Sequence, residues 1–148
     1  MMVYQAFGRL IGPIVVAVLQ WYSRVTHQPR VRVIIVNEQN EVLLVRNWAG
    51  TPFLELPGGG IERGEQPIDA AKRELHEETG ILVEDLMDIG SVTLRYEARL
   101  FLGRAQKTQL PTVKYNRWEI IEIGWHAIAT LPKDVSPLVL VALQKVPK

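Results

Sequence analysis

Residues 56–81 read LPGGGIERGEQPIDAAKRELHEETGI, and this stretch decides the fold. It opens with a proline and three glycines, which end any regular element before them. Pro67 stands where a helix tolerates proline, in its first turn, and Gly80 stands where helices commonly stop. Apolar residues recur at helical spacing between these two positions. The stretch therefore predicts a glycine-rich loop followed by a helix from Pro67 to Thr79.

The predicted helix carries three carboxylates on one arc of its surface. With Glu74 at 0° on a helical wheel, Glu77 falls at about 300° and Glu78 at about 40°. An apolar stripe occupies the neighbouring arc, between about 60° and 140°. The members of the stripe are Ile68, Ala71, Leu75 and Thr79. Because the acidic arc borders the stripe predicted to be buried, we expect the carboxylates to line the edge of a cleft.

The chemistry of these carboxylates has two interpretations. A solvated acidic helix face is the simpler one, although like charges at this spacing destabilise a helix by roughly a few tenths of a kcal/mol per pair. The functional interpretation is a bound hard cation, since carboxylate oxygens are the ligands of Mg²⁺ and Mn²⁺. Zinc is disfavoured because the chain has no cysteine and its histidines lack ligand spacing. These histidines are His27, His76 and His126.

The whole segment resembles the Nudix box. Gly59 is followed after five residues by Glu65, and after seven more by the run RELHEETGI at residues 73–81. Every defined position of the motif is matched, which makes the signal far more specific than a lone glycine-rich loop. The chain is therefore similar to Nudix hydrolases, and the resemblance extends over about residues 30–140.

This resemblance implies a fold and a reaction. The fold is an α/β/α sandwich around a mixed β-sheet, and the reaction is hydrolysis of a nucleoside diphosphate linked to a further group X. Mg²⁺ is the implied cofactor, with Mn²⁺ as an alternative. By resemblance, the metal ligands are Glu74, Glu77, Glu78 and the carbonyl of Gly59, with Glu119 as a further ligand or base.

The resemblance also assigns roles in catalysis. Arg73 is expected to pair with Glu65 and so fix the helix against the loop. The general base is either Glu74 or Glu119. Glu119 matches the family's second position better than Glu122 does, and in a strand the two would point to opposite faces. A structural salt bridge is the simpler alternative for Glu119.

The substrate is predicted less directly. A nucleoside triphosphate, with a purine base favoured, is the first expectation. Tyr96 lies where dinucleoside polyphosphate hydrolases carry a tyrosine, which makes such a dinucleotide the alternative. Glu97 occupies the place of the proline that ADP-ribose hydrolases tend to carry. Stacking and phosphate contacts are predicted for Trp48, Phe53, Trp118, Arg32, Arg46 and Arg95. A non-catalytic nucleotide- or RNA-binding module is the rival from another class.

Short strands are predicted on both sides of the box. Residues 31–36 and 42–45 alternate around a turn and predict a hairpin. Further strands are predicted at residues 81–83, 91–102 and 118–128, and a closing helix at residues 137–144. The pattern as a whole predicts a mixed α/β domain over residues 29–148.

The first 28 residues fall outside the resemblance. Residues 10–22 are almost wholly apolar but are shorter than the roughly 20 residues needed to span a bilayer, so no transmembrane span is expected. They predict an appended helix, apolar around much of its circumference, although a strand is the alternative. A homodimer contact and packing into an internal groove are both consistent with such a helix, and shallow membrane attachment is the less favoured interpretation.

Composition sets the outer limits. The chain has 148 residues, 47% of them apolar, which suits one domain with a substantial core. The net charge of +1 argues against a stable nucleic-acid complex, yet residues 55–85 carry a net −6 and the remainder +7. An acidic segment in an otherwise basic chain suits a Mg²⁺ and polyphosphate site. With no cysteine, a reducing compartment is compatible and a cytoplasmic location is expected.

Overall fold

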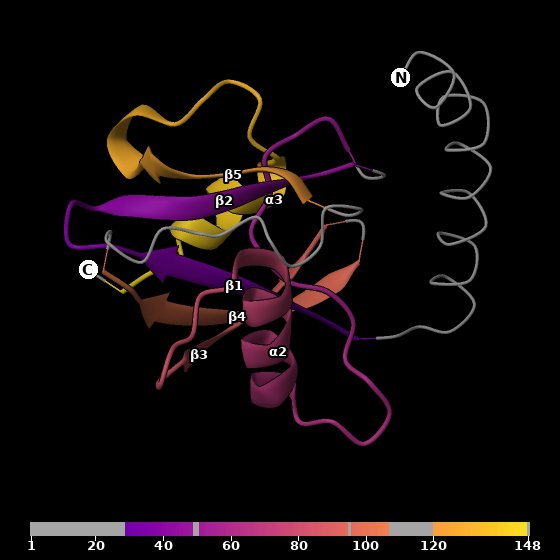
Figure 1. The fold of residues 1–148 in the computed structure, drawn as a ribbon. Coiled ribbons are helices and arrows are strands. Elements are labelled where there is room, and N and C mark those ends of the chain that lie inside the picture. The colour runs from indigo at the N-terminus through magenta and orange to yellow at the C-terminus, as the bar shows by residue number, and fades with distance from the viewer. Residues whose placement is uncertain (1–28, 49–50, 95, 107–119, 148) are drawn as a thin grey trace, which may run out of the picture.

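The structure is a computed structural model that describes residues 29–48, 51–94, 96–106 and 120–147. The predicted helix in residues 10–22 lies outside the described residues, as do Arg95, Trp118 and Glu119. The described residues form one mixed sheet with a helix on each face, as the α/β/α sandwich predicts (Figure 1).

Five strands make up the sheet, in the order β3-β4-β1-β2-β5. β1 and β4 are parallel, with Arg30 opposite Ala98 and Val36 opposite Arg104, and the other neighbours are antiparallel. The strands are β1 (Arg30–Val36), β2 (Glu41–Asn47), β3 (Met87–Thr93), β4 (Glu97–Arg104) and β5 (Ile120–Ala127). The predicted hairpin is confirmed, because β1 and β2 pair beside the turn at residues 37–40.

The two helices cover opposite faces of the sheet (Figure 1). α2 (Pro67–Thr79) packs on the face formed by Val31, Val33 and Ile35 of β1. α3 (Pro137–Leu143) packs on the other face, formed by Ile34 and Val36. Alternation along β1 therefore sends odd-numbered residues toward α2 and even-numbered residues toward α3. Neither helix is long and apolar enough to cross a membrane, nor is any other helix among the described residues.

α2 has the bounds that its sequence predicts. Pro67 opens the helix, and Gly80 closes it in the left-handed conformation with φ of 71°, which a glycine adopts without strain. The buried side of α2 consists of Ala70, Ala71, Leu75 and Thr79. Ile68 was predicted to be buried, and that prediction is wrong, because 37% of it is exposed. The first buried residue of α2 is Ala70. A helical wheel gives the face of a residue but not how far along the helix burial begins.

Two strand predictions are wrong. Residues 81–83 form no strand, and the described part of residues 91–102 belongs to two antiparallel strands rather than to one strand. β3 begins earlier, at Met87, and the chain reverses around residues 94–96 before β4. The reversal has none of the glycine, proline, asparagine or aspartate residues that mark turns, so the apolar alternation runs through it without a break. At the other end, residues 128–130 form a 3₁₀ turn after β5.

The sheet is split between β1 and β2. The two strands pair at Val36 and Val42, but nearer the start of β1 the segment of residues 54–60 lies between them. On the β1 side, the N–H of Val33 donates to the carbonyl of Pro57 at 2.8 Å, and that of Val31 to Gly59 at 3.0 Å. On the β2 side, Val45 and Glu55 exchange backbone hydrogen bonds. These hydrogen bonds fix the glycine loop, residues 57–60, along β1, just before the segment that leads to α2.

Candidate active site

Gly58 is the point where the glycine loop meets both β1 and α2. Its φ is 139°, and a Cβ there would lie 2.3 Å from the carbonyl oxygen of Val31, so only glycine fits. Its N–H donates to Oε2 of Glu78 at 2.8 Å. The loop backbone therefore fixes one of the three glutamates predicted from the sequence.

Gly59 lies directly against a second glutamate. A Cβ on Gly59 would come within 2.5 Å of Oε1 of Glu74, so the missing side chain leaves a cradle that the carboxylate occupies. The carbonyl of Gly59 accepts the N–H of Val31, and a carbonyl oxygen has a second lone pair. Gly59 and Glu74, both metal ligands by resemblance, thus lie side by side, and their role in metal binding stays a prediction.

Arg73 links the helix to the loop, as predicted. Its Nε and Nη2 donate to the two carboxylate oxygens of Glu65 at 2.8 and 2.9 Å, a bidentate pair. Nη2 also donates to the carbonyl of Gly60 at 3.0 Å. Nη1 donates to Glu74 at 2.9 Å and to Glu77 at 3.2 Å. One guanidinium therefore contacts the loop and two of the three glutamates of the arc.

These contacts change the protonation of the site. The hydrogen bonds from Arg73 and from the backbone of Glu62 lower the pKa of Glu65 from 4.5 to about 2. In return, the hydrogen bond to Glu65 raises the pKa of Arg73 above its ordinary value, against an opposing effect of burial. Both groups are therefore fully charged at neutral pH, and the pair is a permanent ionic link.

The three glutamates of the arc, Glu74, Glu77 and Glu78, have the donor chemistry of a site for a hard divalent cation. The cradle at Gly59 brings a loop carbonyl close to Glu74, which supplies a further oxygen of the same kind. Among the described residues, no three His, Asp or Glu side chains converge closely enough to hold a metal ion by themselves. Arg73 bridges Glu74 and Glu77, while Glu78 is bonded to the loop. The oxygen ligands fit a hard divalent cation. Arg73 and the glycine loop hold the carboxylates of the arc apart.

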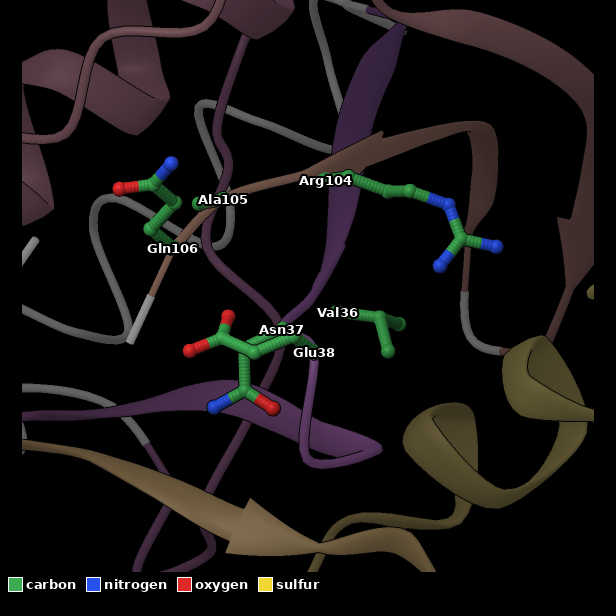
Figure 2. A pocket seen from close by; sticks show the side chains of 6 residues that line it. All are labelled: Val36, Asn37, Glu38, Arg104, Ala105 and Gln106. Atoms are coloured by element: carbon green, nitrogen blue, oxygen red, sulfur yellow. The ribbon is translucent and has the colours of Figure 1, made fainter. Parts of the chain in front are cut away.

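An open hollow of about 480 Å³ adjoins the arc. It is lined by Gly60, Ile61, Glu62, Arg63, Arg73 and Glu74. A second hollow, of about 260 Å³, lies at the opposite end of β1, and there the Arg104 side chain extends away from Asn37 and Glu38 (Figure 2). The two hollows are separated by the length of β1, about 20 Å. Only the first contains residues of the predicted site.

Two of the predicted substrate contacts, the buried Arg32 and the partly buried Tyr96, contact each other. Arg32 is 4% exposed, and its guanidinium donates to the carbonyls of Leu56 and Gly58 and to the hydroxyl of Tyr96. The Tyr96 ring also lies under Arg30, whose guanidinium carbon is 4.9 Å from the ring centroid. The structure therefore brings Arg32 and Tyr96 together, beneath the glycine loop.

The remaining predicted substrate contacts that the structure describes lie near the end of β2. Arg46 donates to Glu122 at 2.6 Å, to Asp134 at 2.7 Å and to the carbonyl of Pro52. Trp48 and Phe53 are 57% and 39% exposed. The contacts of Arg46 are with β5, the segment before α3 and the Pro52 carbonyl, and none of these contacts is with the glutamates of α2.

Glu55 is a polar residue of the segment before the glycine loop, and the sequence motif did not single it out. Its Oε2 lies 3.4 Å from Nη2 of Arg32, and its Oε1 accepts a hydrogen bond from Thr51. Its position just before Leu56 and Pro57, followed by three glycines, is the signal that could have indicated it.

Glu122 accepts a hydrogen bond from Arg46, and by the alternation of side chains along their strands both residues lie on the α3 face of the sheet. Glu119 lies outside the described residues, so its role stays a prediction.

Comparison with known proteins agrees with the geometry. The NUDIX domain profile matches residues 26–142. A MutT Nudix hydrolase from Burkholderia pseudomallei is 25% identical with a TM-score of 0.70, over 81% of this chain and 98% of that one. A MutT structure described for Aliivibrio salmonicida and Vibrio cholerae is 27% identical with a TM-score of 0.59, over 80% and 94%. A Nudix hydrolase from Nitrosomonas europaea is 25% identical with a TM-score of 0.66, over 80% and 86%.

Proposed function

Because this chain belongs to the Nudix hydrolase family, we propose that it hydrolyses the pyrophosphate bond of a nucleoside diphosphate linked to a group X, with Mg²⁺ as cofactor and Mn²⁺ as an alternative. The observation that carries the proposal is the Arg73 network, which joins Glu65, Glu74 and Glu77 to the glycine loop. Nudix hydrolases generally use divalent cations, and an intact network of carboxylates is what such a cation requires.

The roles of the residues follow from their contacts. A bound divalent cation neutralises phosphate charge and activates the attacking water. Glu74, Glu77 and Glu78 would hold it, together with the Gly59 carbonyl. Arg73 orients Glu74 and Glu77 through its donors, and the Gly58 N–H orients Glu78. Glu74 or Glu119 serves as the general base, and the hollow lined by Arg63 and Gly60 admits the phosphate chain.

The glutamates of the arc are the direct test. Glu77→Gln and Glu78→Gln each retain the shape of the side chain but lose the charge, so each should lower Mg²⁺-dependent phosphate or pyrophosphate release by about 10²- to 10³-fold. Asp88→Asn is the matched control, since Asp88 pairs with the exposed Arg99 on β3 and β4 and should retain full activity. Full activity in both glutamine variants would refute the proposal.

A nucleoside triphosphate, with a purine base, is the proposed substrate class, and a dinucleoside polyphosphate is the alternative. The exposed Trp48 and Phe53 offer aromatic surface for a base, beside Arg46 for phosphate. A panel of nucleotides and dinucleotides with Mg²⁺, with products identified by mass, separates the two classes and identifies the bond that is cut. Turnover of dinucleotides alone would overturn the triphosphate assignment.

A non-catalytic nucleotide- or RNA-binding module is the candidate from a different class. It is disfavoured because every acidic position of the box is present in this chain. Nucleotide binding without product formation, unchanged by Glu78→Gln, would favour it.

We further propose that residues 1–28 form an apolar helical extension that mediates a homodimer, and that the protein is cytoplasmic. Deletion of residues 1–27 should convert a dimer to a monomer in light scattering. An unchanged mass would assign the extension to internal packing instead.

A further inference from the structure

We infer that Arg32 is a positioning residue for Glu78, and that it acts through the backbone of Gly58. The inference rests on the proposed function, because it concerns a glutamate proposed to hold the metal. It differs from the sequence-based prediction, in which Arg32 and Tyr96 contact the substrate.

The split in the sheet creates the need for Arg32. β1 donates its N–H groups to the carbonyls of Pro57 and Gly59. The carbonyls of Leu56 and Gly58, which alternate with these, accept Nη1 of Arg32 at 3.2 and 2.7 Å. Buried carbonyls require a donor, and the guanidinium supplies two of these bonds where a neighbouring strand would otherwise do so.

The Gly58 residue joins the two faces of the sheet. Arg32 alternates with Ile34 and Val36 and therefore lies on the α3 side of β1, whereas Glu78 belongs to α2 on the other side. The Gly58 carbonyl accepts from Arg32, and the Gly58 N–H donates to Glu78 at 2.8 Å. A shift of Arg32 would therefore move the donor that fixes the Glu78 carboxylate.

Arg32 is itself held on two further sides. Its Nη2 donates to the Tyr96 hydroxyl at 2.7 Å and lies 3.4 Å from Glu55. Its guanidinium carbon lies 5.9 Å from the centroid of the Tyr96 ring. A buried guanidinium with this many partners has one conformation, which is what a residue that positions another must have. Phosphate, by contrast, would have to displace these protein acceptors to reach it.

Metal affinity without nucleotide is the decisive measurement, because it separates positioning of Glu78 from contact with phosphate. Free Mn²⁺ is titrated by electron paramagnetic resonance against the full-length chain and its variants. Arg32→Lys keeps the charge but cannot reach all four partners, and it should weaken Mn²⁺ binding about tenfold. Tyr96→Phe removes one acceptor and should weaken binding by a smaller factor. Arg99→Lys, in an exposed arginine paired with Asp88, should leave binding unchanged.

A double-mutant cycle tests whether the effect passes through Glu78. In a Glu78→Gln background, Arg32→Lys should change Mn²⁺ affinity by less than about twofold, whereas in a Glu77→Gln background its full effect should remain. Equal effects in both backgrounds would overturn the inference, as would unchanged Mn²⁺ affinity with a raised KM for nucleotide. If Arg32→Lys does not fold, as judged by thermal melting, Tyr96→Phe enters the same cycle and the same outcomes decide.

The two proposals fail in different ways. If Glu78→Gln weakens Mn²⁺ binding but Arg32→Lys does not, the inference about Arg32 is wrong and the proposed function stands. If Glu78→Gln leaves Mn²⁺ binding unchanged, the metal role of Glu78 is wrong and the inference about Arg32 is overturned with it, whereas the proposed function fails only if Glu77→Gln is also without effect.

Discussion

Arg73 on α2 and Arg46 on β2 have similar sets of partners in two different settings. Each binds two or more carboxylates and one backbone carbonyl. The Glu65 and Glu74 partners of Arg73 have side chains 16% exposed. The Arg46 partners, Glu122 and Asp134, have side chains 48% and 50% exposed.

The difference shows that the number of ion pairs does not measure their importance. Water competes with Arg46 for hydrogen bonds to its exposed carboxylate partners and screens their charges. Such ion pairs contribute little to the free energy of unfolding. The bidentate Arg73–Glu65 pair is better shielded from water. It joins two residues eight positions apart and so connects α2 to the loop before it, the two segments that carry the predicted metal ligands. We therefore expect the loss of Arg73 to lower both stability and activity, and the loss of Arg46, whose partners are Glu122, Asp134 and the Pro52 carbonyl, to lower stability less.

Removing each arginine tests this comparison most strongly. Arg73→Met should lower the free energy of unfolding by about 2 kcal/mol, because hydrogen bonds to charged groups in a partly buried site are lost. Arg46→Met should lower it by less than about 1 kcal/mol. Urea denaturation of both variants measures the two values. Equal losses would show that the difference in exposure has no energetic consequence.

The cradle at Gly59 offers a change that affects activity alone. In Gly59→Ala, the new Cβ would meet the end of the flexible Glu74 side chain, which can move aside, so the fold should be retained. Activity should fall about tenfold to a hundredfold, because a predicted ligand is displaced by the order of an ångström. Kinetics and thermal melting are measured on the same sample. Gly64→Ala is the contrasting variant, since its φ of 84° strains an alanine although a Cβ there meets nothing within 4 Å, and it therefore tests backbone strain without a clash.

The smallest expected effect is a change in the pH dependence of stability, and it concerns the Arg73–Glu65 pair. Arg73 and the Glu62 backbone lower the Glu65 pKa from 4.5 to about 2, so this carboxylate stabilises the fold above its unfolded-state pKa. The contribution is lost as the pH falls through this window, from about 4.5 to about 2. The stability gap between wild type and Glu65→Gln should therefore narrow between about pH 7 and about pH 2.5 in urea titrations. A gap that is the same at both pH values would contradict this assignment.

Local sequence predicted much of the fold and brought the residues of the candidate site to attention. The bounds of α2 follow from Pro67 and Gly80, whose backbone preferences act within one turn. The Arg73–Glu65 pair was implied by the resemblance to the Nudix box, and the structure contains it. The hairpin of β3 and β4 did not follow, because the residues at the reversal carry no turn signal.

The amino-acid sequence by itself determined where the helix lies, that its glutamates share an arc, and which family's reaction they imply. The first two properties depend on residues close together in the chain, where spacing and backbone preference suffice, and the reaction is what the resemblance to the family implies. Only the tertiary structure decided that Arg32 is buried, that it reaches Gly58, and that Ile68 remains exposed. Such facts depend on a sheet that splits between β1 and β2 and on segments that meet across it, and no local pattern encodes those contacts.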